Sequence, residues 1–277
     1  MKTRYTWRLL DPVPRMSALI RCKDAPRLVG AAALLLLSVA ASPLPAPSGA
    51  GTVGNQDDTF AAARGSMLDD IRAVSSVVSL GDGPQSISER TMAILADVPR
   101  HLFVPKDLQN KAYENRPLPI GYGQTISQPF IVAVMTDVLE IRPGHKVLEL
   151  GTGSGYQAAV LGRLGARVFT IEIIPDLAES AAARLREMEY KTVSVRTGDG
   201  YYGWPEDAPF DRIIVTASAS HIPPPLIAQL AAGGRMVIPV GGPFAVQELL
   251  LVEKGKDSTL STRSLLPVQF VPLTGPH

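Results

Sequence analysis

The feature that most restricts the fold of this chain is a glycine-rich run, Glu149-Leu150-Gly151-Thr152-Gly153-Ser154-Gly155-Tyr156. It follows the apolar segment 146–150, which predicts a buried strand, and it opens a helix predicted over 155–164. Glycines at such a junction permit positive φ and let a ligand approach the backbone closely. Their spacing is G-x-G-x-G, and Tyr156 occupies the third position of the dinucleotide fingerprint, so a pyrophosphate cradle is disfavoured. The run predicts either a small-molecule site at a strand end or a tight structural turn.

The segments around this run alternate between strand and helix patterns. Such alternation predicts an α/β fold with a doubly wound, mostly parallel, seven-stranded, Rossmann-like sheet. Ligands of these sheets bind at the carboxyl ends of the strands. Ser86-Ile87-Ser88-Glu89 has the pattern of a capping box for a helix to Asp97, and 99–129 is predicted to be loop. The predicted strands are 146–150, 167–173, 193–196, 212–216, 235–240, 248–253 and 267–273, and the other helices are 129–140, 155–164 and 175–190.

Two acidic residues follow the second and third strands and indicate a nucleoside ligand. Glu172 stands 21 residues after Gly151, where a carboxylate can accept from both ribose hydroxyls. Asp199, within Gly198-Asp199-Gly200, is placed to accept from an adenine amino group. NAD enzymes share the first acid, whereas the glycine loop preceded by Glu149 resembles the first motif of S-adenosylmethionine-dependent methyltransferases. The alternatives are a plain strand-end acid at position 172 and an ordinary Asp-Gly turn at 199.

Charge and cysteine content exclude other classes of protein. The 277 residues include 27 basic and 26 acidic side chains, for a net charge of +1, which argues against a surface that neutralises nucleic-acid phosphates. The single cysteine, Cys22, excludes a disulfide framework and a cysteine-based zinc site. Neither a bound metal nor a nucleic-acid partner is expected.

The N-terminal 66 residues differ in composition from the rest. Seven basic residues precede or flank an apolar run of 14 residues, 28–41, which is shorter than the roughly 20 that a membrane-spanning helix needs. Residues 1–41 are therefore predicted to be a secretory signal peptide, with an uncleaved anchor as the alternative. Residues 42–66, rich in Pro, Gly, Ala and Ser, are predicted to be a flexible linker, and 67–277 the methyltransferase domain.

Removal of residues 1–41 would leave a net charge of −4. The mature protein is then expected in the periplasm or outside the cell, without stable insertion in a membrane. A cytoplasmic location is the alternative, if translation starts near Met67.

Three segments carry a resemblance to a known family. They are Val98-Pro99-Arg100-His101-Leu102-Phe103-Val104-Pro105, residues 121–129, and residues 198–213. Through them the chain, from about residue 87 to residue 274, resembles the protein-L-isoaspartate O-methyltransferase family of repair enzymes. The resemblance implies methyl transfer from S-adenosylmethionine to the α-carboxylate of L-isoaspartyl residues in damaged proteins. The ester then closes to a succinimide, whose hydrolysis yields some normal aspartate.

The resemblance also implies the site residues. Ser127, in the family's Thr-Ile-Ser loop, would be the catalytic residue and would orient the acceptor carboxylate rather than attack it. On spacing alone, Ser127 could instead be the N-cap of the helix that begins near Pro129. Residues 271–274 are expected to offer backbone partners to an extended peptide. The expected cofactor-binding residues are Gln124, Thr125, Ile126, Glu149, Gly151, Thr152, Gly153, Ser154, Gly155, Glu172, Asp199, Gly200 and Thr216.

The expected partners are isoaspartyl-containing proteins and peptides, and the enzyme is expected to be a monomer. Two other functions remain open. One is a methyltransferase of the same fold that acts on another carboxylate or a small molecule. The other is a non-catalytic protein that binds S-adenosylmethionine without turnover.

Overall fold

The computed structural model describes residues 59–78, 86–242 and 246–276. The predicted signal peptide over 1–41 lies outside these residues, and so does the predicted linker up to residue 58. The last part of that linker is helical instead, because helix α1, Ala61–Ser75, begins within it. The folded part of the chain therefore starts before the predicted boundary at residue 67.

Helix α1 belongs to the core of the protein. Met67 and Ile71, four residues apart on one helix face, are fully buried. The ring of Phe60, just before the helix, stacks on His101 with 4.1 Å between the ring centroids. The small residues at positions 61, 62, 65 and 66 are exposed. Their composition resembles that of a linker because they form the solvent side of a helix.

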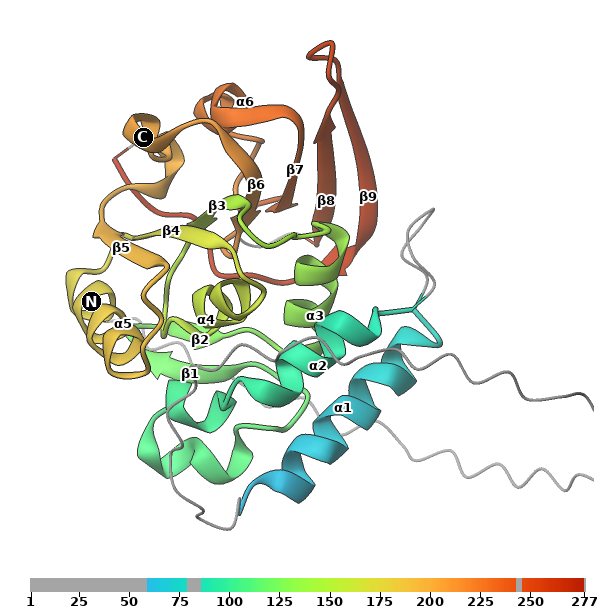
Figure 1. Cartoon of the computed structure of the whole chain (residues 1–277), viewed down its shortest axis with the longest axis vertical. Coiled ribbons are helices and arrows are strands. Elements are labelled where there is room, and N and C mark those ends of the chain that lie inside the picture. The colour runs from blue at the N-terminus through green and yellow to red at the C-terminus, as the bar shows by residue number, and fades with distance from the viewer. Residues whose placement is uncertain (1–58, 79–85, 243–245, 277) are drawn as a thin grey trace, which may run out of the picture. The chain divides into compact units, whose positions relative to one another are not determined.

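Seven strands form one mixed sheet in the order β5-β4-β3-β6-β7-β8-β9 (Figure 1). The neighbours from β5 to β7 are parallel, whereas β7–β8 and β8–β9 are antiparallel. The central strands are nearly continuous apolar runs because both faces of the sheet are covered. This confirms the predicted fold. The strands are β3 Lys146–Leu150, β4 Arg167–Glu172, β5 Val193–Thr197, β6 Phe210–Val215, β7 Leu230–Val240, β8 Gln247–Lys254 and β9 Leu260–Val268.

Helices cover the two faces of the sheet and bury separate apolar clusters. On one face, side chains such as Met135, Val160 and Leu185 pack together with α1. On the other face, Phe210 and Leu226 lie in a second cluster with Trp204 packed against it. The remaining α-helices are α2 Glu89–Asp97, α3 Pro129–Val138, α4 Tyr156–Arg163, α5 Pro175–Glu187 and α6 Pro224–Gln229.

The structure corrects three local predictions. Helix α2 begins at Glu89 and is capped by Ser88, whose hydroxyl accepts the Thr91 N–H, so the cap lies two residues after the predicted capping serine, Ser86. The predicted loop over 99–129 contains an antiparallel hairpin, β1 Leu118–Gly121 and β2 Gln124–Ile126. The last strand of the sheet is β9, which ends at Val268, rather than residues 267–273. Strand β8 pairs with β9, the segment that follows β8 in the chain.

Residues 271–273 do not extend the sheet but return to its centre. Ser218 donates its N–H to the Val271 carbonyl at 2.8 Å, and Leu273 donates to the Ser218 carbonyl at 2.7 Å. Ser218 follows β6, which lies beside β3, and β4 lies on the other side of β3. The order of the strands reverses at β3, and the crevice at such a point is where these sheets bind ligands. The tail therefore reaches the predicted site. Within the described part of the chain, no helix is long and apolar enough to cross a membrane.

Candidate active site

The glycine loop lies at the carboxyl end of β3, facing the end of β6. Gly151, Gly153 and Gly155 have φ angles of +93°, +53° and +89°, which favour glycine. At Gly151 a Cβ atom would lie 2.5 Å from Thr216 Oγ1, so a side chain has no room. The Thr216 hydroxyl is within reach of the Leu150 and Gly151 carbonyls, at 2.9 and 2.8 Å. This contact fixes the loop against the neighbouring strand.

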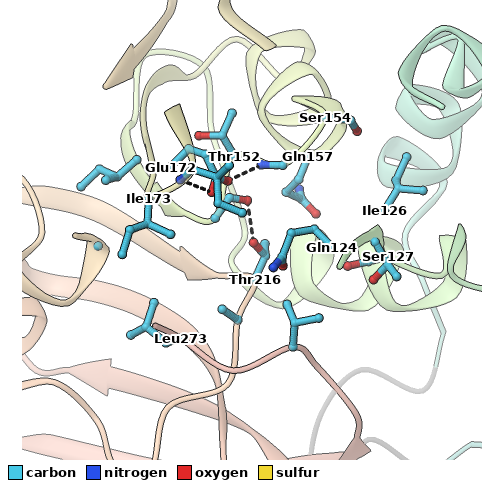
Figure 2. A pocket seen from close by; sticks show the side chains of 18 of the residues that line it. Gln124, Ile126, Ser127, Thr152, Ser154, Gln157, Glu172, Ile173, Thr216 and Leu273 are labelled. Atoms are coloured by element: carbon cyan, nitrogen blue, oxygen red, sulfur yellow. Dashed lines mark hydrogen bonds between the residues drawn. The ribbon is translucent and has the colours of Figure 1, made fainter. Parts of the chain in front are cut away.

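A pocket opens beside the loop, with about 810 Å³ of empty space including its mouth. Figure 2 shows the apolar side chains of Ile173 and Leu273 toward one end of the pocket. Ile126 and the hydroxyl-bearing Ser127 lie toward the other end. The predicted residues that line it are Gln124, Thr125, Ile126, Ser127, Gly151, Thr152, Gly153, Ser154, Glu172, Gly200 and Thr216.

Glu172 ends β4 and holds two loops of the pocket together. Its side chain is only 5% exposed, and its carboxylate accepts the N–H of Gly153 at 2.8 Å and that of Ile174 at 3.0 Å. Each carboxylate oxygen has a second lone pair, so the group can still accept from ligand hydroxyls. Glu172 is thus both a structural anchor of the glycine loop and a candidate ribose ligand.

Three predicted residues do not line the pocket. Gly155 is the N-cap of α4, and the Asp199 carboxylate accepts the Tyr201 N–H of its own turn at 2.9 Å. Glu149 is fully buried in β3, and neither carboxyl oxygen has a hydrogen-bond partner among the described residues. Burial raises the pKa of Glu149 to about 8, so this side chain is mostly a neutral acid near pH 7. Direct contact of these three with a cofactor stays a prediction.

The β1–β2 hairpin brings Gln124, Thr125 and Ile126 over the pocket. Its tip contains Tyr122, whose hydroxyl donates to Asp176 Oδ2 at 2.8 Å in the first turn of α5. Thr125 and Ile126, which were predicted to bind the cofactor, both line the pocket. The hairpin therefore forms one side of the site.

Ser127 follows the hairpin and lies where two pockets meet. A second pocket, bounded by α3 and residues 267–271, shares Thr125, Ser127, Thr216 and Val271 with the first. The N-cap of α3 is Gln128, whose side chain makes no cap hydrogen bond, and the Phe130 N–H in the first turn donates to Asn115 Oδ1 at 3.1 Å. In the described part of the chain the Ser127 hydroxyl has no hydrogen-bond partner, so the N-cap alternative does not account for it.

Several lining residues were not predicted. Ile173 directly follows Glu172. Its position next to the acid at the end of the strand could have been used to predict that it lines the pocket. Gln157 is the second residue of α4, and its side chain donates to Thr136 Oγ1 at 3.0 Å. Residues 271–274 were expected to contact the peptide, but Leu273 and Thr274 line the cofactor pocket. No local pattern connects them to the glycine loop.

The family of the chain follows from its match to a family model. Residues 80–277 match the model described as protein-L-isoaspartate(D-aspartate) O-methyltransferase. The chain belongs to this family. This isoaspartyl methyltransferase is an S-adenosylmethionine-dependent enzyme of class EC 2.1.1.77.

Similar proteins cover most of this isoaspartyl methyltransferase. A Polaromonas sp. protein-L-isoaspartate O-methyltransferase 2 is 61% identical over 209 residues, which are 76% of this chain and 99% of the relative. A Cupriavidus necator protein-L-isoaspartate O-methyltransferase 1 is 55% identical over 244 residues, 88% of this chain and 93% of the relative. A solved protein-L-isoaspartate O-methyltransferase has a TM-score of 0.66 at 27% identity and covers 76% of this chain and 66% of its own.

A further solved structure shows the shared fold. This Plasmodium falciparum protein, crystallised with S-adenosyl-L-homocysteine, has a TM-score of 0.63 at 22% identity, over 76% of this chain and 97% of its own.

The pocket of this isoaspartyl methyltransferase suits S-adenosylmethionine on the structure's own features. Gly151 and Gly153 line the pocket without side chains, so a ligand can approach the backbone of the glycine loop closely. The buried Glu172 carboxylate suits ribose hydroxyls, and Ile173 and Leu273 offer apolar surface to a base. No cluster of three or more His, Cys, Asp or Glu side chains suited to a metal occurs in the described ranges.

Proposed function

We propose that this isoaspartyl methyltransferase carries out methyl transfer at Ser127, with the cofactor in the pocket beside Gly151 and the peptide in the second pocket. The observation that carries the proposal is the shared wall: Ser127, Thr125, Thr216 and Val271 line both pockets. A donor and an acceptor held on the two sides of this wall would meet at the serine.

In this reaction the protein mainly has to position the two reactants and exclude water. S-adenosylmethionine supplies an electrophilic methyl group when bound. The acceptor carboxyl has an ordinary pKa of about 4, so it is ionised at neutral pH and needs no general base. The Ser127 hydroxyl donates a hydrogen bond that orients this carboxylate. It is not a nucleophile, because no base is hydrogen-bonded to it in the described part of the chain. Ile131 and Val271 are apolar residues of the second pocket that help to exclude water.

The test is a comparison of two peptides that differ only in the linkage at one aspartate. The isoaspartyl peptide should accept methyl groups from S-adenosylmethionine, and the aspartyl twin should not. Methylation of both twins at similar rates would favour an acceptor of another kind, and tight cofactor binding without methylation of either would favour the non-catalytic alternative.

We predict that Ser127→Ala lowers kcat/KM for the isoaspartyl peptide by about tenfold, the loss expected for one hydrogen bond to a charged group. Cofactor affinity and melting temperature should stay close to wild type, because the hydroxyl caps no helix. Peptide kinetics, calorimetry with S-adenosylmethionine and thermal melting check the three parts. Ser220→Ala removes an exposed hydroxyl outside both pockets and is the control. A lower melting temperature with normal kinetics would restore a structural role for Ser127.

We also propose that residues 1–41 direct export and are then removed, since a basic segment followed by a short apolar run is typical of signal peptides. The expected result is a mature N-terminus near residue 42 or residue 51 when protein from the native host is examined by mass spectrometry. An intact N-terminus in the cytoplasmic fraction would show that the leader has another role.

A further inference from the structure

Arg100 is an arginine with a fully buried side chain at the back of the site. It lies in a short 3-10 helix, Arg100–Phe103, and is 0% exposed. Its Nε donates to the Ala112 carbonyl at 2.7 Å, and its Nη2 donates to the Ser127 carbonyl, also at 2.7 Å. The guanidinium carbon lies 4.8 Å from the centre of the Tyr156 ring. A buried cation therefore holds the backbone of the residue at which methyl transfer is proposed.

This cation has no acidic partner within the described ranges. Its guanidinium contacts the carbonyls of Ala112 and Ser127 and the ring of Tyr156. The residues that oppose the effect of burial on its pKa are Tyr156 and Tyr113. Arg100 Nη1 and the Tyr156 hydroxyl are both buried without a well-formed hydrogen bond in this part of the chain. Burying a charge is costly unless it is paired. Burial of the Arg100 charge therefore lowers the stability of the fold, and hydrogen bonds to carbonyls alone offset this loss poorly.

A second buried arginine shows the contrast. Arg212 is 9% exposed and donates to the carbonyls of Leu139 and Asp211. The carboxylates of Asp211 and Glu140 lie near it and favour its charge. Arg212 thus has nearby acids, and it lines neither pocket of the site. The unbalanced charge at Arg100 is therefore not a general property of buried arginines in this protein.

Arg100 contacts two residues that line the proposed reaction site. The two residues that it contacts on that side, Ser127 and Tyr156, both line the cofactor pocket, and Ser127 also lines the second pocket. Because Arg100 holds the Ser127 backbone, an ionised carboxylate bound at Ser127 would place a negative charge near the guanidinium. In a buried site the attraction between such charges is screened less than in water.

We propose that Arg100 is a positioning residue that fixes the Ser127 backbone and makes the acceptor site select an ionised carboxylate over a neutral group of the same shape. This inference rests on the proposed role of Ser127. Two nitrogens of one planar guanidinium reach two carbonyls from different segments, which a lysine ammonium cannot reproduce with the same geometry. The fork therefore orients the loop, and the charge provides the selectivity.

The experiment compares an isoaspartyl peptide with its twin in which the α-carboxylate is a carboxamide. Dissociation constants of both are measured by calorimetry on full-length enzyme loaded with S-adenosyl-L-homocysteine. Arg100→Gln should reduce the preference for the charged peptide by about tenfold, the effect of losing one nearby opposite charge, with little change for the carboxamide. The control Arg212→Gln should lower the melting temperature and leave the preference at the wild-type value. An unchanged preference in Arg100→Gln would overturn the proposal.

Arg100→Lys separates charge from geometry and serves also if Arg100→Gln does not fold. It should keep the preference within about threefold, since the charge remains, while kcat for the isoaspartyl peptide falls because the fork to Ala112 and Ser127 is lost. A wild-type kcat in Arg100→Lys would overturn the positioning role. Wild-type enzyme and Ser127→Ala are assayed in parallel. If wild type does not methylate the isoaspartyl peptide, the proposed function fails, whereas a failure confined to the Arg100 variants concerns this inference alone.

Discussion

Glu172→Ala is expected to weaken S-adenosylmethionine binding by about 10- to 150-fold, the equivalent of roughly 1.5–3 kcal/mol for lost charge-assisted hydrogen bonds. The carboxylate anchors the Gly153 and Ile174 N–H groups, so its removal also leaves two donors unpaired next to the ligand. The melting temperature of the ligand-free protein should fall for the same reason. Calorimetric titration with S-adenosylmethionine, together with thermal melting, measures both effects.

Glu172→Gln is the matched variant, because it keeps the size of the side chain and one acceptor oxygen. Its affinity should lie between those of wild type and Glu172→Ala, since the amide nitrogen cannot accept from the second N–H. A dissociation constant of Glu172→Ala within threefold of wild type would show that the ribose is held by other residues.

Glu149→Gln is expected to abolish a large loss of stability that the wild-type protein undergoes as the pH rises. The Glu149 pKa is about 8 in the folded protein against an ordinary value of 4.5, so the folded state holds the extra proton between these values. Wild-type stability should therefore fall between about pH 4.5 and pH 8, by a total of about 4–5 kcal/mol, and change no further from this group above that range. Glutamine resembles the neutral acid and has no proton to lose.

Urea unfolding of the ligand-free protein at several values between pH 5 and pH 9 measures this difference. The gap between Glu149→Gln and wild type should be small at pH 5 and widest at pH 9. Glu179→Gln, on the exposed side of α5, should run parallel to wild type throughout. A constant gap between Glu149→Gln and wild type across the range would mean that the Glu149 carboxyl is ionised in the folded state.

Most of the parallel sheet and the cofactor side of the site were predictable because their signals are local. The glycine loop directly follows its strand, and Glu172 ends the next strand, so position in the chain already places both at one sheet edge. The role of Ser127 was harder to predict. A serine before Gln128-Pro129 has the pattern of a helix cap, and only the structure shows that its hydroxyl caps nothing.

What the sequence did not predict depends on contacts between distant segments. The burial of Met67 and Ile71 requires the rest of the fold, whereas the small exposed residues beside them give the composition of a linker. The path of residues 267–273 has a similar cause. Their apolar character suits a strand equally well, and hydrogen bonds to Ser218 draw the tail to the pocket instead.

The return of the tail to Ser218 has a consequence for biosynthesis. Val271, Leu273 and Thr274 complete the wall of the cofactor pocket, and in the chain they come after all the strands of the described sheet, so they are synthesised after those strands. A nascent chain can therefore form the sheet before it can hold the cofactor tightly. A ligand stabilises only the state that binds it. S-adenosylmethionine therefore stabilises chains in which the tail has completed the pocket, and not chains that lack this segment. Proteolytic removal of the segment from residue 269 onward would take this stabilisation away, while all the strands of the sheet remain in the chain.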